Sequence, residues 1–247
     1  MTEKEFSRLV KRKITNNIFN PQIRVILFDF DGTLVNTTPL ILRSFRATWA
    51  KFFGFTLDDR TFIKTFGMLI HTAIKQLIEL SAANGQIALP NDLNAKAEEV
   101  LHVYRAFNLK WHDEMIEPFP NIVEVLEELR LRHLRLGVVS SKIRKGVEHG
   151  LNLFQMAELF DVIIGAEDVD NHKPHPEPLL KAMERLEAMP RETIFIGDST
   201  HDIVAGRAAQ MLTAAATWGP FQREDLESLL PDYLLDEPSE ILTMVKL

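Results

Sequence analysis

Apolar side chains recur along the chain with two spacings, one typical of buried strands and one typical of helices. The stretch 24–34 opens with an apolar run rich in β-branched and aromatic side chains, which predicts a buried strand. Further strands are expected at 134–139, 162–164, 193–196, 212–217 and 233–235. Helical spacing separates the strands, as in the run Ile122, Val125, Leu126 and Leu129 behind an Asn121 cap. This alternation predicts right-handed crossovers and an α/β fold with a parallel sheet.

The stretch from Thr38 to about Trp111 carries helical spacing and almost no strand signal. One apolar run comprises Ile70, Ile74, Leu77 and Ile78, and a second starts at Leu93 with Asn91 as its expected cap. We therefore predict a helical cap at 37–117, inserted after the first strand of a Rossmann-like core that comprises 23–36 and 118–247. Residues 1–22 form an N-terminal extension, for which we expect a short helix and a loop.

Composition and charge narrow the classes of function. The 247 residues are 46% apolar, which suits a sizeable core, and the net charge of −7 argues against a general nucleic-acid binder. No stretch approaches the roughly 18 apolar residues that span a bilayer, and the charged N-terminus lacks the apolar segment of a signal peptide. We therefore expect a cytoplasmic protein with no membrane partner. Because the chain has no cysteine, thiolate catalysis is excluded and a hard cation such as Mg²⁺ is favoured over a thiolate-bound metal.

Polar side chains gather where the predicted strands end. In chain order they are Asp29 with Asp31, Ser140 with Ser141, Lys173 before Pro174, and Asp198 with Asp202. An Asp-x-Asp-Gly segment alone is as often a solvated turn as a site. Ligands of an open parallel sheet, however, bind beyond the carboxyl ends of its strands, so we expect these four clusters to converge there.

Carboxylates that face a phosphate need a cation, because unit charges 4 Å apart repel by about 4 kcal/mol at an effective dielectric near 20. We expect Asp29, a backbone carbonyl near Asp31, and Asp198 to hold Mg²⁺. Lys173 would add a positive charge opposite the metal. The residues expected to contact phosphate are Gly32, Thr33, Ser140, Ser141 and Lys173.

These four clusters, in this order, resemble the motifs of the haloacid dehalogenase superfamily of phosphatases, over about residues 24–242. The resemblance implies that Asp29 attacks phosphorus and forms an aspartyl-phosphate, and that Asp31 is the acid and base. It also implies that Ser140 and Lys173 stabilise the transferring phosphoryl group and that Asp198 anchors Mg²⁺. Asp202 either orients these groups or simply favours the N-terminus of a helix.

Asp31 distinguishes phosphatases from the dehalogenases of the superfamily, which lack this second aspartate. The helical insertion resembles the cap of the subfamily that includes phosphoglycolate phosphatase and β-phosphoglucomutase. Several shorter stretches, 104–108, 112–113, 172–178 and 201–206, resemble the bacterial inorganic pyrophosphatase branch close to the phosphoglycolate phosphatases. The resemblance therefore implies a small phosphorylated substrate, with pyrophosphate first and 2-phosphoglycolate or another small monoester second.

Two other functions remain open from the sequence. A phosphomutase would return the phosphoryl group to a sugar, and a binding module would keep the fold without turnover. The histidines form no dense group with zinc-like spacing beyond the loose trio His172, His175 and His201, which we interpret as loop or supporting residues. The sequence indicates no oligomeric state.

Overall fold

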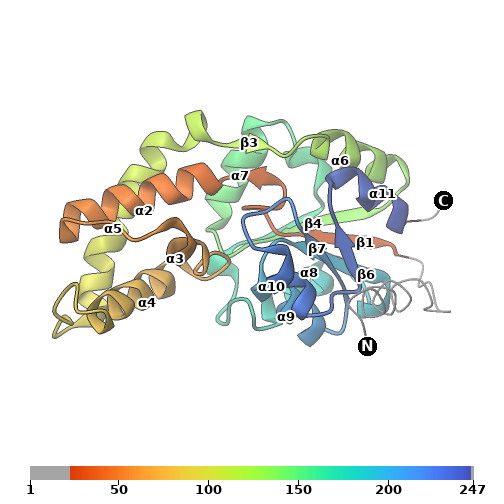
Figure 1. The fold of residues 1–247 in the computed structure, drawn as a ribbon. Helices are drawn as coiled ribbons and strands as arrows, with labels where there is room; N and C mark the ends of the chain where they lie inside the picture. Colours follow the sequence, from red (N-terminus) through yellow and green to blue (C-terminus); the bar gives the residue numbers. More distant parts are fainter. Residues whose placement is uncertain (1–22, 246–247) are drawn as a thin grey trace.

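A parallel sheet of six strands forms the centre of the computed structural model, which describes residues 23–245 (Figure 1). Its strand order is β5-β4-β1-β6-β7-β8, and every neighbouring pair is parallel. The bounds are β1 Val25–Phe28, β4 Arg135–Val139, β5 Val162–Ile164, β6 Thr193–Gly197, β7 Leu212–Ala216 and β8 Tyr233–Leu235. The predicted α/β fold is confirmed. The extension predicted at 1–22 lies outside the described residues.

Strand β1 occupies the middle of the sheet because its side chains are buried on both faces. Ile26 and Phe28 contribute to one hydrophobic cluster, whereas Val25 and Leu27 contribute to the cluster on the opposite face. This division follows from the two-residue period of a strand. From β1 the chain proceeds to β4 and β5 on one side and returns to β6, β7 and β8 on the other. The carboxyl end of β1 is therefore the switch point at which open sheets bind ligands.

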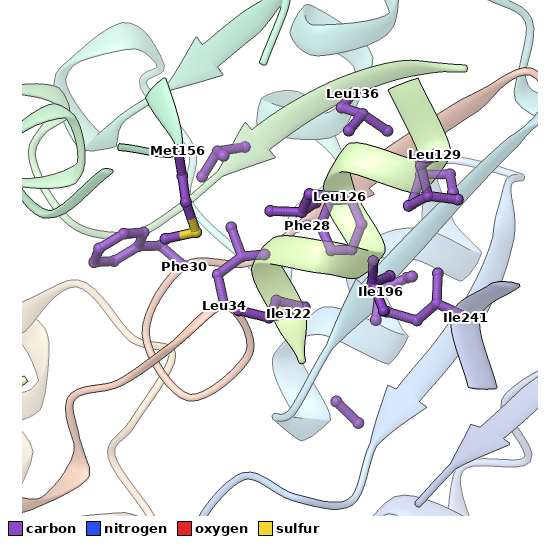
Figure 2. Packing of buried hydrophobic residues seen from close by; sticks show 14 of the residues in the cluster. Phe28, Phe30, Leu34, Ile122, Leu126, Leu129, Leu136, Met156, Ile196 and Ile241 are labelled. Carbon is purple, nitrogen blue, oxygen red and sulfur yellow. The ribbon is translucent and has the colours of Figure 1, made fainter. Parts of the chain in front are cut away.

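Helices cover both faces of the sheet. The first cluster includes apolar residues of α6 (Ile122–Leu131), α7 (Arg144–Leu153) and α11 (Ile241–Met244), and Figure 2 shows Leu126 and Leu129 of α6 close to Phe28 and Ile196. The second cluster includes α8 (Glu177–Arg185) and α9 (Thr200–Ala208). A smaller cluster joins α9 to α10 (Arg223–Ser228) through Leu226.

The remaining helices form a separate layer beside the sheet (Figure 1). They are α2 Thr38–Phe53, α3 Asp59–Ile63, α4 Ile70–Ala83 and α5 Leu93–Met115. An antiparallel ribbon of β2 (Val35–Asn36) and β3 (Glu117–Pro118) pairs the two connections between this layer and the sheet. The helices share a hydrophobic cluster in which Phe45 stacks on Phe62 with ring centroids 5.0 Å apart. The division into a core and a cap stays a prediction.

Of the two predicted helix caps, one is wrong and the other is confirmed in position only. Helix α5 begins at Leu93, so its cap is Asp92, whose carboxylate accepts a hydrogen bond of 2.9 Å from the Ala95 N–H, and not Asn91. Asn121 does precede α6, but it adopts a left-handed conformation with φ of 64° and its side chain makes no capping bond. Asparagine therefore suits this position because it tolerates a positive φ, and not because its side chain accepts a hydrogen bond.

No helix among residues 23–245 is both long and apolar enough to cross a membrane.

Removal of the Trp49 side chain tests whether the helical layer unfolds separately from the sheet. Trp49 is fully buried, and its ring lies 5.7 Å from that of Phe62, so Trp49→Ala is expected to cost about 3–5 kcal/mol. Hydrogen exchange should accelerate in α2–α5 and remain slow in β1 and β6. Leu27→Ala is the matched change in the sheet. Equal acceleration in both regions of the Trp49→Ala protein would contradict a separate cap.

Candidate active site

Asp29 lies directly beyond β1, where the backbone still follows the sheet. Its N–H donates to the Ile196 carbonyl at 2.9 Å, and its Oδ1 accepts from the Phe30 N–H at 2.7 Å. The residue is only 4% exposed. Asp31 is more open, since the chain turns away from the sheet at Gly32, which has a φ of +79°. The two carboxylates therefore occupy different environments although one residue separates them.

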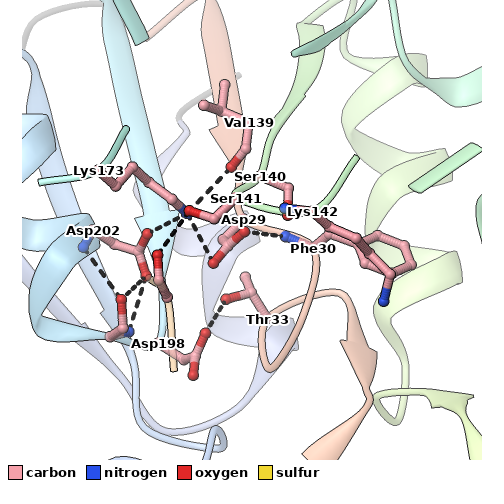
Figure 3. A network of polar contacts seen from close by, with 12 residues as sticks. Asp29, Phe30, Thr33, Val139, Ser140, Ser141, Lys142, Lys173, Asp198 and Asp202 are labelled. Carbon is pink, nitrogen blue, oxygen red and sulfur yellow. Dashed lines mark hydrogen bonds and ion pairs between the residues drawn. The ribbon is translucent and has the colours of Figure 1, made fainter. Parts of the chain in front are cut away.

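Lys173 connects two of the buried carboxylates (Figure 3). Its Nζ lies 2.9 Å from Asp29 Oδ2 and 2.7 Å from Asp202 Oδ1, and its side chain is 1% exposed. Asp202 Oδ2 accepts from both the N–H and the hydroxyl of Ser199, at 3.0 and 2.6 Å, and so caps α9. Both interpretations of Asp202 therefore describe real contacts: it positions Lys173, and it stabilises a helix N-terminus.

Asp198 lies just beyond β6 in a cradle formed by two glycines. A Cβ on Gly32 would be 2.5 Å from Asp198 Oδ2, and a Cβ on Gly219 would be 2.3 Å from Asp198 Cβ. The Thr33 hydroxyl donates to Asp198 Oδ1 at 3.0 Å. Larger side chains at either glycine would displace the carboxylate, so these glycines are there for close approach. The role of Gly219 was not predicted, because only the folded chain brings it to Asp198.

The site holds more buried carboxylates than ammonium groups, since Lys173 alone contacts both Asp29 and Asp202. Burial, together with the charge of Asp202, raises the pKa of Asp29 to about 7 against the lowering effect of Lys173. Burial, followed by the charges of Asp202 and Asp29, also raises the pKa of Asp198 well above its ordinary value. One oxygen each of Asp29, Asp198 and Asp202 lies within 4.8 Å of the others. This set of hard oxygen donors with excess negative charge fits a divalent cation.

A cavity of about 550 Å³ opens between this end of the sheet and the helical layer. Asp29, Asp31, Gly32, Ser140 and Asp198 line it from the sheet, and residues of α2, α4 and α5 line it from the helices. Lys173, Asp202 and Thr33 lie behind these residues and are not in the lining. The structure thus brings all the predicted site residues to one place but divides them into a lining and a supporting layer.

The two serines after β4 make different contacts. Ser140 is 5% exposed, lines the cavity, and accepts a hydrogen bond of 3.2 Å from the Lys142 N–H. Ser141 also lines the cavity, but its hydroxyl donates to the Gly67 carbonyl at 2.7 Å, in the segment between α3 and α4. Ser141 therefore connects the sheet to the helical layer, and its contact with phosphate stays a prediction.

Two features of the cavity were missed in the sequence. Lys142 places its Nζ 2.9 Å from Asp31 Oδ1 and lies over the Phe30 ring; its position just after the serine pair was the available signal. His112, Asp113 and His149 form a second compact group, with potential ligand atoms within 4.8 Å of one another. The sequence singled out 112–113 only for its resemblance to pyrophosphatases, and the only histidine group considered was His172, His175 and His201, since α5 and α7 meet only in the folded chain.

Comparisons with known proteins agree with this geometry. Residues 26–216 match the model of the family described as haloacid dehalogenase-like hydrolase. A pyrophosphatase named PpaX from Bacillus mycoides is 36% identical over 224 residues, which cover 91% of this chain and 97% of that protein. The PpaX pyrophosphatase of Bacillus cereus strain B4264 is 37% identical over the same length and shares.

Solved structures give the same result. A Bacteroides fragilis protein assigned as a haloacid dehalogenase-like hydrolase is 27% identical, with a TM-score of 0.78 over 89% of this chain and 99% of its own. A Lactobacillus plantarum protein assigned as a phosphoglycolate phosphatase is 28% identical, with a TM-score of 0.76 over 90% of this chain and 99% of its own. Both assignments are provisional.

The titration of Asp29 tests the electrostatic description of this site. In metal-free protein its carboxyl carbon is expected to titrate near pH 7 in ¹³C NMR, with the signal assigned by its loss in Asp29→Asn. Since Lys173 lowers this pKa, Lys173→Met should raise the midpoint further. Asp113, whose pKa is lowered by hydrogen bonds from His112 and His149, is the internal control. An Asp29 midpoint near 3.8 would contradict the description.

The same shift has a consequence for folding stability. The pKa of Asp29 is higher in the folded protein than its ordinary value of 3.8. Its contribution to the free energy of unfolding is therefore fully present below about pH 4 and is lost as the pH rises through about 7.

Proposed function

This chain belongs to the haloacid dehalogenase-like hydrolases, and from that premise we propose that it is a Mg²⁺-dependent phosphohydrolase that transfers a phosphoryl group to Asp29. The single observation that carries the proposal is the position of Asp29. Its carboxylate lines the cavity at the switch point of the sheet, with Lys173 2.9 Å away and Asp198 beside it. A nucleophile there would meet a phosphoryl group next to positive charge.

The first step forms a bond between an Asp29 oxygen and phosphorus while the bond from phosphorus to the leaving oxygen breaks. Asp31 lines the same cavity and is the residue proposed to protonate that leaving oxygen. Asp31 then accepts a proton from the water that attacks the aspartyl-phosphate, and orthophosphate leaves. Proton donation and acceptance balance over the two steps, so Asp31 returns to its initial state.

Lys173 prepares Asp29 for this role in two ways. Its ammonium group is held by Asp202 as well as by Asp29, so the nucleophile keeps a fixed position through a contact at the base of the cavity. The positive charge also favours the ionised form of Asp29, against the effect of burial on its pKa. Only the ionised carboxylate can attack phosphorus.

Asp29 and Asp198 are the side chains proposed to hold Mg²⁺, because both line the cavity. Asp202 is less suited as a direct ligand, since it does not line the cavity. When bound, the cation would neutralise the repulsion between the carboxylates and the phosphate oxygens. A contribution from the backbone carbonyl near Asp31 stays a prediction.

Pyrophosphate is the proposed substrate. The supporting observations are the PpaX pyrophosphatases, 36–37% identical over nearly their whole length, and a cavity with several basic side chains. Arg105, Lys142 and Lys145 all line the cavity, in a protein whose net charge is −7. Local positive charge is what a highly anionic substrate requires.

Asp29→Asn tests the nucleophile. We expect phosphate release from pyrophosphate to fall by at least about 10³-fold, because the amide cannot attack phosphorus, with the fold retained. Release should be compared across pyrophosphate, 2-phosphoglycolate, sugar phosphates and nucleotides. Asp170→Asn, a change at an exposed aspartate, is the matched control.

The panel separates the rival functions. Release that depends on Asp29 but favours 2-phosphoglycolate would retain the mechanism and change the substrate. Interconversion of sugar phosphates, dependent on a bisphosphate, would indicate a phosphomutase. Normal activity of the Asp29→Asn protein would overturn the mechanism.

Mg²⁺ should stabilise the folded protein through Asp198. Binding at 100 times the dissociation constant adds about 2.7 kcal/mol to the free energy of unfolding, which thermal unfolding with and without Mg²⁺ will measure. Asp198→Asn is expected to abolish most of this gain, whereas Asp170→Asn should retain it. An undiminished gain in Asp198→Asn would contradict the assignment of the metal ligand.

A further inference from the structure

His112, near the C-terminal end of α5, presents an unpaired nitrogen in a buried place. The residue is 6% exposed, and its Nε2 has no hydrogen-bond partner among residues 23–245. Its Nδ1 lies 2.7 Å from Asp113 Oδ1. A buried polar atom without a partner costs about 1–3 kcal/mol. The cost suggests that a ligand supplies the missing partner.

Asp113 determines which protonation state His112 adopts. Its carboxylate can only accept hydrogen bonds, and the same oxygen lies 2.7 Å from His149 Nε2 on α7. The pKa of Asp113 is lowered, chiefly by the hydrogen bond from His112, so it is ionised at neutral pH. The His112 Nδ1 therefore carries a hydrogen. Its Nε2 is a lone-pair acceptor in the neutral ring and a donor in the imidazolium form.

His112 belongs to the lining of the same cavity as the proposed nucleophile, whereas Asp113 does not. Lys142 links His112 to the reaction centre, since its Nζ is 2.9 Å from Asp31 Oδ1 and its charge acts on His112. Arg105, another lining residue on α5, forms no ion pair within the described part of the chain. This part of the cavity therefore offers basic side chains to an anionic ligand.

We propose that His112 binds the second acidic group of the substrate, the one that is not transferred to Asp29, through a hydrogen bond from Nε2 to an anionic oxygen. The proposal rests on the proposed function and specifies which substrates the site prefers. The second group is a phosphoryl group in pyrophosphate and a carboxylate in 2-phosphoglycolate. Substrates with an uncharged leaving group offer no such oxygen.

Binding should take up a proton. Burial first, and the positive charge of Lys142 among the further causes, hold the pKa of His112 below its ordinary value in the free protein, while Asp113 acts in the opposite direction. An anion next to Nε2 offsets the charge of Lys142 and favours the imidazolium form. The other charged or titratable groups facing His112 are Asp113 on its own helix and His149 on α7.

The group His112, Asp113 and His149 needs no metal ion to satisfy these contacts. Both nitrogen–oxygen distances are 2.7 Å, which is a hydrogen-bond length between an imidazole N–H and a carboxylate. Those two bonds leave the His112 Nε2 unpaired. The proposal therefore rests on the unpaired atom and not on the cluster itself.

Steady-state kinetics of His112→Phe test the proposal. Phenylalanine keeps a ring of similar shape and removes both nitrogens. A hydrogen bond to a charged group contributes about 1.5–3 kcal/mol, so KM for pyrophosphate and 2-phosphoglycolate should rise about 10- to 100-fold. The kcat/KM for p-nitrophenyl phosphate should change less than about twofold. His112→Gln, which retains a donor near Nε2, should restore part of the affinity.

His102→Gln is the matched control, since His102 is an exposed histidine on the same helix. Titration calorimetry of methylenebisphosphonate, which has an uncleavable bridge, provides a measurement independent of turnover. In two buffers of different ionisation enthalpy the wild-type protein should take up more protons on binding than His112→Phe, which should also bind more weakly. Orthophosphate binding should be equal in both proteins.

Several outcomes would overturn the inference. An unchanged KM for both diacidic substrates in His112→Phe would show that Nε2 does not contact them. An equal loss with p-nitrophenyl phosphate would indicate that His112 only supports the structure. Either result, together with turnover that still requires Asp29, would reject the inference and leave the proposed function intact. Turnover that does not require Asp29 would reject the proposed function itself.

Discussion

The charge balance at the end of β1 is the constraint on which the rest of the structure depends. Asp29, Asp198 and Asp202 are almost fully buried, and Lys173 is the cation in contact with two of them. Buried charges are tolerated only when they are paired and hydrogen-bonded. The Phe30 N–H satisfies part of this requirement at Asp29, Ser199 at the N-terminus of α9 does so at Asp202, and the Thr33 hydroxyl does so at Asp198. Positive charge remains in deficit there, which is why the site fits a cation and an anionic substrate together.

The sheet strands provide acidic side chains at the base of the cavity. Basic side chains and an unpaired imidazole nitrogen come from α5 of the helical layer and from the loop after β4. Contacts that cross between the two layers, such as Ser141 with Gly67 and Asp113 with His149, hold these opposite charges at a fixed separation. The chemistry of phosphoryl transfer and the choice of substrate would therefore reside in different parts of the chain.

Such a separation would let relatives share one reaction and differ in substrate. The family match covers residues 26–216, and similar structures carry assignments as hydrolases or phosphoglycolate phosphatases. The positions of the carboxylates around Lys173 are fixed by strand ends and a helix cap, so these residues have little freedom to change. Residues on the exposed turns of α5 face fewer constraints, so changes there can alter the substrate without disturbing the buried charges.

The sequence by itself determined the sheet and the identity of its acidic groups, because both depend on local patterns. The apolar run at 25–28 and the spacing of Asp29 and Asp31 are properties of neighbouring residues, and neighbours hold that spacing in any fold. Helix starts were less certain: Asp92 and not Asn91 caps α5, since adjacent polar residues compete for one backbone position. Tertiary structure alone decided the pairing of Lys142 with Asp31, 111 residues apart, and of His149 with Asp113, 36 apart. Such contacts depend on how the helices pack on the sheet, and no local period along the chain records that packing.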